Sequence, residues 1–204
     1  MAQSKRPKRF ILIHADESCL RNGAEEATPG GAGVLIEAST PDGIARRDVF
    51  ICAPDTTNNR MALAGAIAAF ALLSQRGRRY RVLLVSDSEY LVKGMTEWLP
   101  TWKARGWRRK GGKIENLELW QKLAQATAGH HVRWQWVRGH AGHPKNEYVN
   151  DLAMRAAAEQ LHSNGPEPSH FEEWLSERQK RKMFAGYDPD DDFAECEMNM
   201  VGES

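Results

Sequence analysis

Two continuous apolar segments, each ending at a carboxylate, constrain the fold of this chain most strongly. Residues 10–16 read F-I-L-I-H-A-D and end at Asp16, and residues 80–86 read Y-R-V-L-L-V-S and are followed by Asp87. Segments of this length without regular alternation predict strands buried on both faces, as in the centre of a parallel arrangement. If the two strands are neighbours, the carboxylates of Asp16 and Asp87 converge at one edge of the sheet.

Turn signals and apolar periodicity place the other elements around these two strands. We expect further strands at 33–37, 47–52 and 132–137, and helices at 58–74, 89–104, 115–128, 146–162 and 168–183. Asn58 or Asn59 is expected to cap the first of these helices. Three early strands followed by alternating helices and strands predict an α/β fold, with a sheet of about five strands and helices packed on it.

Charge is distributed unevenly along the chain, although the formal net charge is only +1. Residues 187–204 contain seven acids and no Lys or Arg, so residues 1–186 carry 28 basic and 20 acidic residues, or about +8. A basic body with an acidic tail is typical of proteins that bind nucleic acids. We expect the tail to compete for the basic surface as a phosphate mimic; the alternative is a tail that only improves solubility.

Composition divides the chain into four regions. We expect a flexible basic arm at 1–9, the folded domain at 10–162, a linker and helix at 163–186, and a disordered acidic tail at 187–204. No segment reaches the ~20 apolar residues of a membrane span, and no apolar stretch follows the basic N-terminus as in a secretory signal. The three cysteines are widely spaced, which argues against disulfides and a zinc cluster. We therefore expect a cytoplasmic monomer.

Six segments together resemble the type 1 ribonuclease H family. They are D-E-S-C-L-R-N at 16–22, T-T-N-N-R-M at 56–61, S-D-S-E-Y at 86–90, W-K-A-R-G-W at 102–107, L-W-Q-K-L at 119–123 and W-V-R-G-H-A-G-H-P-K-N-E at 136–147. All six follow in family order at family spacing. The resemblance implies a ribonuclease H-like fold over residues 10–162, with a five-stranded mixed sheet flanked by helices. It also implies metal-dependent cleavage of the RNA strand of an RNA–DNA hybrid, leaving a 3′-hydroxyl and a 5′-phosphate.

In this family four carboxylates hold two divalent cations, and two of the four are missing here. Asp16 matches the first position and Asp87 the third. Ala62 stands at the second position, where the family has Glu, and Asn150 at the fourth, where the family has Asp. Carboxylates offset the repulsion between two cations ~3.5–4 Å apart. We therefore expect Mg²⁺ or Mn²⁺ to bind weakly if at all, with Asn150 offering only a neutral oxygen, and cleavage to be absent or severely slowed.

Three glutamates are candidates for replacement ligands. Glu17 stands where the family usually has Gly, and Glu25 and Glu26 lie in a loop that is longer than usual in the family. Alternation along a strand should turn Glu17 away from Asp16, and the other two are equally consistent with a solvated loop. Asp151 is expected to point elsewhere, because one residue along a helix turns a side chain by about 100°.

The family residues implied in hybrid recognition are largely present. Polar residues at positions that contact the nucleic acid are Asn22, Asn58, Asn59 and Asn146. A basic protrusion between Trp98 and Lys113 contains Trp102 and no acid, and its cations are Lys103, Arg105, Arg108, Arg109, Lys110 and Lys113. His140 matches the family histidine that assists proton transfer or product release; without full metal ligation it is expected to be a relic.

Three functions remain open on the sequence. The first is an RNA–DNA hybrid-binding protein, or binder of a related duplex, whose catalysis is lost. In that case Ala62 and Asn150 arose either by natural divergence in a pseudo-enzyme or by engineered inactivation. The other departures near the site favour natural divergence. The second is an active ribonuclease H with relocated metal ligands. The third is a protein-interaction subunit that binds a protein partner through residues 163–204.

Overall fold

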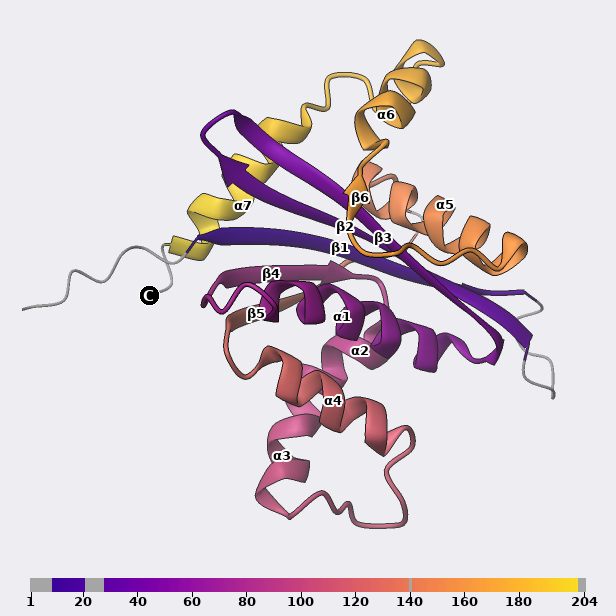
Figure 1. The fold of residues 1–204 in the computed structure, drawn as a ribbon, viewed down its shortest axis with the longest axis vertical. Helices are drawn as coiled ribbons and strands as arrows, with labels where there is room; N and C mark the ends of the chain where they lie inside the picture. The colour runs from indigo at the N-terminus through magenta and orange to yellow at the C-terminus, as the bar shows by residue number, and fades with distance from the viewer. Residues whose placement is uncertain (1–8, 21–27, 140, 202–204) are drawn as a thin grey trace, which may run out of the picture.

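A mixed six-stranded sheet forms the centre of the computed structural model, which describes residues 9–20, 28–139 and 141–201 (Figure 1). The strands are β1 (Phe10–Cys19), β2 (Thr28–Thr40), β3 (Gly43–Thr56), β4 (Arg81–Ser86), β5 (His131–Trp136) and β6 (Glu167–Pro168). Their order is β5-β4-β1-β2-β3-β6. β4 is parallel to both β1 and β5, while β1, β2 and β3 form an antiparallel meander. The predicted mixed α/β sheet is confirmed, with the two-residue β6 as an additional strand.

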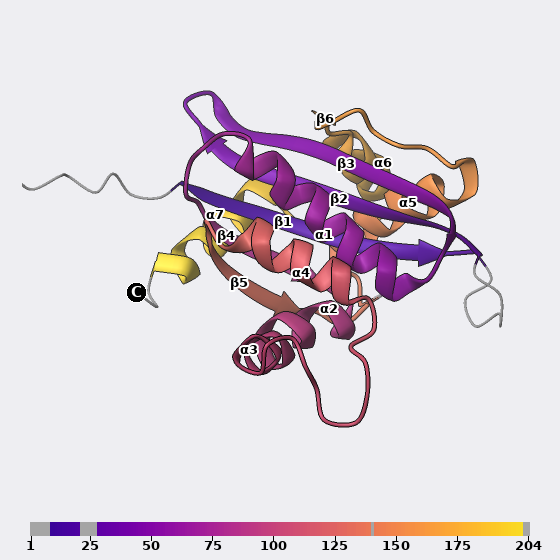
Figure 2. The same ribbon diagram turned by 60° about the horizontal axis from the view of Figure 1, so that its bottom comes forward.

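Helices α1 (Asn58–Ser74) and α4 (Leu117–Thr127) cover one face of the sheet (Figure 2). Ile11, Ile13 and Ala15 point to this face, as alternate residues of one strand should, and they join a core cluster with Phe70 and Trp120. Between β4 and α4 the chain forms α2 (Glu89–Lys93), the π-helical turn η1 (Gly94–Trp98) and α3 (Leu99–Ala104). These three consecutive segments together occupy the single helix predicted at 89–104.

The cap of α1 differs from the prediction. Thr57, not Asn58 or Asn59, is the N-cap residue, and its hydroxyl accepts a hydrogen bond of 3.4 Å from the Arg60 N–H. Thr57 has the extended backbone that a cap residue adopts. Asn58 and Asn59 therefore lie in the first helical turn, where capping does not occupy their side chains.

Helices α5 (Pro144–Glu159), α6 (Phe171–Lys180) and α7 (Pro189–Val201) lie on the other side of the sheet (Figure 1). Two glycines of β2 allow α5 to approach closely: a Cβ on Gly33 would stand 2.3 Å from the Val149 carbonyl oxygen, and one on Gly31 would stand 2.4 Å from that of Ala153. Side chains larger than hydrogen at these two positions would push α5 outward. The glycines thus set how near the N-terminus of α5 lies to the strand ends.

The prediction of a disordered acidic tail is wrong for residues 189–201. They form α7, whose Phe193 and Met200 are buried against Phe10 and Leu12 of β1. The prediction of disorder rested on the number of acids in this segment and did not consider the spacing of its apolar residues. These residues recur at helical intervals on one face. The tail also does not compete for the basic protrusion, because α7 packs against β1 and β4 on the side of the sheet away from α3 (Figure 1).

The predicted linker is likewise part of the fold. Ser163 donates its N–H to the Phe50 carbonyl at 2.9 Å, and β6 pairs with Arg47 and Asp48 of β3. Phe171 and Leu175 of α6 are buried in a cluster with residues of β2 and α5. The basic arm at 1–8 lies outside the described residues. Among the described residues, none of the helices has the length and apolarity to cross a membrane.

Candidate active site

The neighbouring strands β1 and β4 bring two carboxylates together, Asp16 within β1 and Asp87 directly after β4. Their parallel register pairs Ala15 with Ser86, so Asp16 and Asp87 follow one step beyond the last pair. The Asp16 side chain is buried and interacts with Asp87. Burial first, and then repulsion from Asp87 and Glu17, raises the pKa of Asp16 well above its usual range. The strand ends therefore concentrate negative charge in a region shielded from water.

Glu17 belongs to the same carboxylate cluster, although alternation was expected to turn it away. Burial and the charge of Asp87 raise the pKa of Glu17 to about 8, while a hydrogen bond with Ser88 opposes this rise. Glu17 does leave the strand on the face opposite to Asp16. Asp87, however, stands beyond the end of β4, where both faces of the sheet are within reach. Alternation thus separates Glu17 from Asp16 as expected, but it does not separate Glu17 from Asp87, because β4 has already ended at Ser86.

The side of the sheet on which Glu17 emerges is the side of Ala62. Residues 11, 13, 15 and 17 alternate onto the face that α1 covers, and Ala62 of α1 packs in one cluster with Ala15. On this face of the sheet, α1 therefore presents Ala62, while the adjacent strand β1 presents the carboxylate of Glu17.

The N-terminal part of α5 contributes an amide to this cluster. The Asn146 Nδ2 donates to the Asp87 Oδ2 at 3.4 Å, and Asn146 is only 3% exposed. Asn146, predicted to contact nucleic acid, therefore lies among the carboxylates. Asn150, one turn further along, donates to the Met154 sulfur at 3.5 Å. Asp151 accepts hydrogen bonds from Trp174 and Arg178 of α6, so it points away from the strand ends as expected.

Three further residues shape the surroundings of Asp87, and sequence reasoning missed them. The Ser88 side chain forms a hydrogen bond with Glu17, and the Trp136 indole donates a hydrogen bond of 3.0 Å to the Asp87 carbonyl oxygen. A Cβ on Gly139 would stand 2.4 Å from the Asp87 Oδ2, so only glycine leaves room for that carboxylate. Ser88 lies in the S-D-S segment and Gly139 in the G-H-A-G-H-P segment, and these two segments were the sequence signals that could have indicated both residues.

The donor chemistry of the cluster fits a hard divalent cation. Asp16, Glu17 and Asp87 offer carboxylate oxygens, which Mg²⁺ and Mn²⁺ prefer, and burial, followed by repulsion from neighbouring carboxylates, raises the pKa of the first two. Within residues 9–20, 28–139 and 141–201, no three His, Cys, Asp or Glu side chains are already arranged around a point where a metal would sit. His140, Asn22, Glu25 and Glu26 lie outside the described residues.

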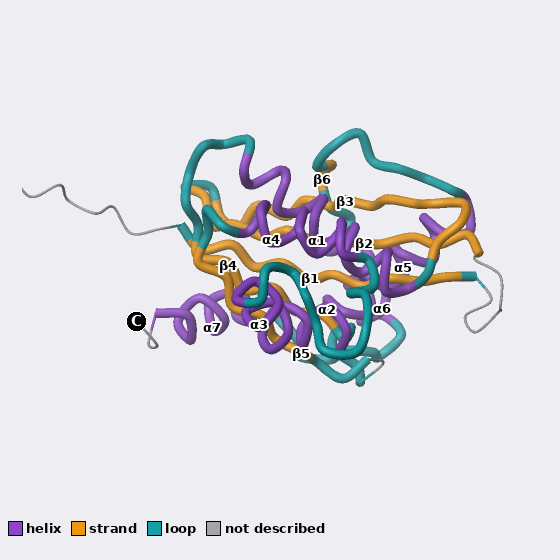
Figure 3. Tube along the Cα trace, turned by 90° about the horizontal axis from the view of Figure 1, so that it is seen from below, coloured by secondary structure: helices purple, strands orange, loops and turns teal. Residues whose placement is uncertain are grey.

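The basic protrusion is exposed to solvent. It comprises α3 and the loop that follows it, which Figure 3 shows as a long connection leading to α4. Its exposed cations are Lys103, Arg105, Arg108, Arg109, Lys110 and Lys113. Trp102 was predicted in the interface, but it is 9% exposed and packs against Trp98 and Trp120. The Trp102 ring therefore braces α3, and its contact with a nucleic acid stays a prediction.

Comparisons with known proteins agree with this arrangement. The family model for RNase H matches residues 8–158. The chain is 44% identical over 153 residues to a ribonuclease H of Pseudomonas paraeruginosa, with 74% of this chain and 96% of that protein covered. It is 43% identical over 153 residues, with the same coverage, to the ribonuclease HI of Pseudomonas aeruginosa.

A solved structure is also similar to this chain. It is the crystal structure of LC9-RNase H1, described as a type 1 RNase H with the type 2 active-site motif. The two chains are 53% identical and superpose with a TM-score of 0.79, covering 85% of this chain and 83% of the other. The chain therefore belongs to the type 1 ribonuclease H family.

Proposed function

We propose that this protein is an active, metal-dependent ribonuclease that cleaves the RNA strand of RNA–DNA hybrids, with Glu17 in place of the carboxylate missing at position 62. The observation that carries the proposal is the Glu17 carboxylate, which lies with Asp87 and Ser88 on the side of Ala62. LC9-RNase H1, described as having an active-site motif of another type, supports a relocated set of ligands. The expectation of catalytic silence gave little weight to Glu17 as a replacement ligand, because alternation turns its side chain away from Asp16.

Each residue of the cluster has a role in this reaction. Asp16, Glu17 and Asp87 would hold Mg²⁺ or Mn²⁺. Such ions, when bound, activate a water for attack on the phosphodiester and stabilise the leaving oxygen. Asn146 orients the Asp87 carboxylate through its amide, and the absence of a side chain at Gly139 leaves that carboxylate its space. His140 remains the proposed group for proton transfer or product release.

Hybrid binding rests on the protrusion and on α1. The six exposed cations from Lys103 to Lys113 face solvent and can meet phosphates of the DNA strand. Asn58 and Asn59, freed from capping, offer amides that can read a ribose 2′-hydroxyl in the minor groove. Recognition and cleavage then use neighbouring parts of one surface. We also propose that the protein acts as a cytoplasmic monomer.

A cleavage assay tests the proposal. A hybrid with a 5′-labelled RNA strand is incubated with the full chain and Mg²⁺, in parallel with Mn²⁺ and with EDTA. We expect RNA products with 3′-hydroxyl ends with either metal, none with EDTA, and none from the same RNA in a double-stranded RNA. Absence of turnover with both metals, in a protein that still binds the hybrid, would contradict the proposal.

That contradicting outcome would instead support a hybrid-binding protein without catalysis. Asn150 favours this second candidate, because its amide is turned to Met154 and does not join the carboxylates in any described contact. A protein-interaction subunit that uses the extension is less favoured. Phe171, Leu175 and Phe193 are buried against the domain, so they are not available to a partner.

The protrusion predicts a salt dependence. Changing Arg108, Arg109 and Lys110 together to Gln should raise KM for the hybrid and leave kcat nearly unchanged, because these cations lie away from the carboxylates. Each phosphate contact contributes about −0.9 to the slope of log affinity against log salt. We therefore expect the slope to flatten by about 2–3, measured by fluorescence anisotropy between 50 and 200 mM salt.

A matched triple change provides the control for this measurement. Arg76, Arg78 and Arg79 are equally exposed, but they precede β4, whereas Asp87 follows it. Changing them to Gln removes the same net charge from the other end of the strand. If both triple variants flatten the slope equally, the protrusion is not the binding surface and only overall charge acts.

The raised pKa of Glu17 predicts how stability changes with pH in the metal-free protein. Between about pH 5 and 8 the folded state retains a proton that the unfolded chain loses near 4.5, so stability falls as pH rises through this interval. Glu17→Gln removes the effect. We expect the variant to be more stable than wild type by about 1–3 kcal/mol at pH 9 and equal to it at pH 4.5, in thermal unfolding with EDTA. Equal stability of the two proteins at pH 9 would show that Glu17 carries no repelled charge.

A further inference from the structure

Two cations are buried beneath the C-terminal helices with one carboxylate between them. Glu37 of β2 is inaccessible to solvent; its Oε1 lies 2.9 Å from the Arg46 Nε and its Oε2 lies 2.8 Å from the Lys145 Nζ. The Lys145 side chain is 0% exposed and that of Arg46 is 6% exposed. One negative charge cannot neutralise two positive ones, and an unpaired buried charge is strongly destabilising.

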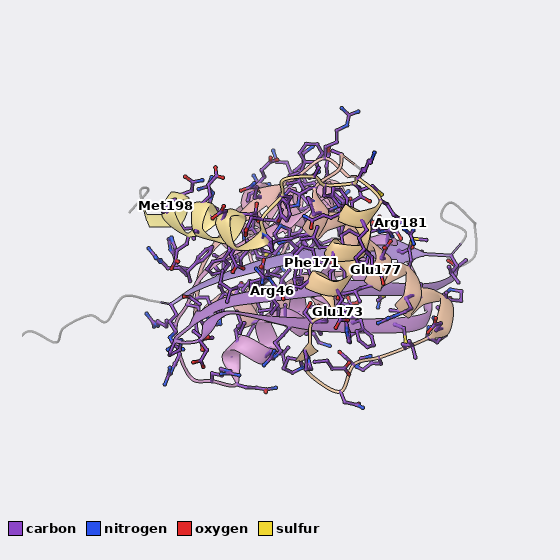
Figure 4. All side chains as sticks on the ribbon, turned by 90° about the horizontal axis from the view of Figure 1, so that it is seen from above. Arg46, Phe171, Glu173, Glu177, Arg181 and Met198 are labelled. Carbon is purple, nitrogen blue, oxygen red and sulfur yellow. The ribbon has the colours of Figure 1, made fainter. Side chains whose placement is uncertain are left out.

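The extension supplies the remaining negative charge. Asp192 of α7 lies 2.7 Å from the Lys145 Nζ, which also donates to the Pro189 carbonyl at 3.3 Å. Asp190 of α7 and Glu172 of α6 each lie 2.5 Å from the Arg46 guanidinium. Figure 4 shows Arg46 between α7, which carries Met198, and α6, which carries Phe171.

Lys145 also lies next to the carboxylate cluster in sequence. The following residue, Asn146, donates to the Asp87 carboxylate. His143, the N-cap residue of α5, stacks on the buried His14 ring at 5.2 Å, and its Nε2 lies 3.9 Å from the Asp192 Oδ1. The segment from His143 to Asn146 is therefore held by α7 on one side and holds Asp87 on the other.

We propose that α7 acts as a brace for the catalytic centre and that Asp192 is a positioning residue, acting through Lys145 and Asn146 on the carboxylate of Asp87. This inference rests on the proposed ribonuclease activity. The chain of contacts runs from Asp192 to Lys145, one residue along α5 to Asn146, and from its amide to Asp87. Asp192 itself touches neither the carboxylates nor the basic protrusion in any described contact.

The test compares two neighbouring aspartates of one helix. Asp192→Asn removes the charge opposite Lys145, and Asp191→Asn removes an exposed charge one residue away. Outer partners of metal ligands typically change metal affinity or activity 10–100-fold. For Asp192→Asn we expect kcat to fall about 10–100-fold, the Mg²⁺ concentration for half-maximal activity to rise, and KM for the hybrid to stay within about threefold. Asp191→Asn should match wild type, and Asp192→Glu should restore most of kcat.

Amide hydrogen exchange of residues 145–147 gives a readout that does not depend on turnover. Faster exchange confined to this segment in Asp192→Asn, with Asp191→Asn unchanged, supports the brace even if wild type proves inactive and the proposed activity fails. Identical behaviour of the two variants in kcat, Mg²⁺ dependence and exchange would overturn it. Exchange accelerated throughout the domain, with kcat and hybrid affinity lost in parallel, would also overturn it, because Asp192 would then serve stability alone.

Discussion

Glu17→Gln is expected to lower kcat for hybrid cleavage by about 10²–10⁴, which corresponds to about 3–5 kcal/mol of lost transition-state stabilisation. The amide keeps the size of the side chain and can still bond Ser88, so the fold should be unaffected. In the proposed reaction, the change removes one of the three carboxylates that would hold the metal ion. Steady-state kinetics with a fluorescent hybrid in Mg²⁺ measure the effect, and KM should change little because the protrusion is untouched.

Asp151→Asn is the matched control for this change. It also removes a carboxylate near the usual ligand positions, but Asp151 faces Trp174 and Arg178 of α6. Its kcat should remain within about twofold of wild type. If instead Asp151→Asn abolished cleavage and Glu17→Gln did not, the replacement ligand would have been assigned to the wrong residue.

Removing α7 should cost a large share of the stability of the domain. A chain that ends at Gly186 exposes Phe10, Leu12 and their neighbours on the sheet, leaves Lys145 with Glu37 alone, and leaves Arg46 with Glu37 and Glu172 but without Asp190. Burial of Phe193 and Met200 is worth about 1.5–3 kcal/mol each, and loss of partners for buried cations adds to this. We expect a loss of about 4–8 kcal/mol, measured by urea unfolding, against a typical total of about 5–15 kcal/mol.

Point variants on α7 distinguish the loss of one buried side chain from the loss of the whole helix. Phe193→Ala should cost about 3–4 kcal/mol, because Phe193 is buried against Phe10. Met198→Ala, on the same helix but 66% exposed, should cost at most about 0.5 kcal/mol. An equal urea midpoint for wild type, the chain ending at Gly186 and Phe193→Ala would show that α7 does not dock in solution.

The parts of the fold that the sequence predicted are those with strong local signals. The apolar runs before Asp16 and Asp87 predicted two central parallel strands and the meeting of two carboxylates, because burial on both faces leaves no alternation. The proposed relocation of the carboxylate to Glu17 was weighed but disfavoured on the sequence. Alternation along β1 separates Glu17 from Asp16 but not from Asp87, because the neighbouring strand β4 has already ended at Ser86.

The docking of α7 could not be predicted because it depends on partners distant in the sequence. Asp190 and Asp192 read as a solvating acidic run until Arg46 and Lys145 are known to lie beneath them. Those cations in turn gave no sign of being buried, since buried Lys and Arg are rare without a paired charge. Trp102 shows the same limit: its place among cations suggested an interface, while its packing against Trp98 and Trp120 is known only from the structure.

Anomalous scattering from crystals grown with Mn²⁺ tests the central claim most directly. The account predicts an ion whose ligands include the Glu17 carboxylate together with Asp87 and Asp16, and loss of that ion in Glu17→Gln crystals. Two results would contradict the proposal that Glu17 replaces the carboxylate missing at position 62. One is an ion held by Asp16 and Asp87 while Glu17 stays hydrogen-bonded to Ser88, and the other is equal occupancy of the ion in wild-type and Glu17→Gln crystals.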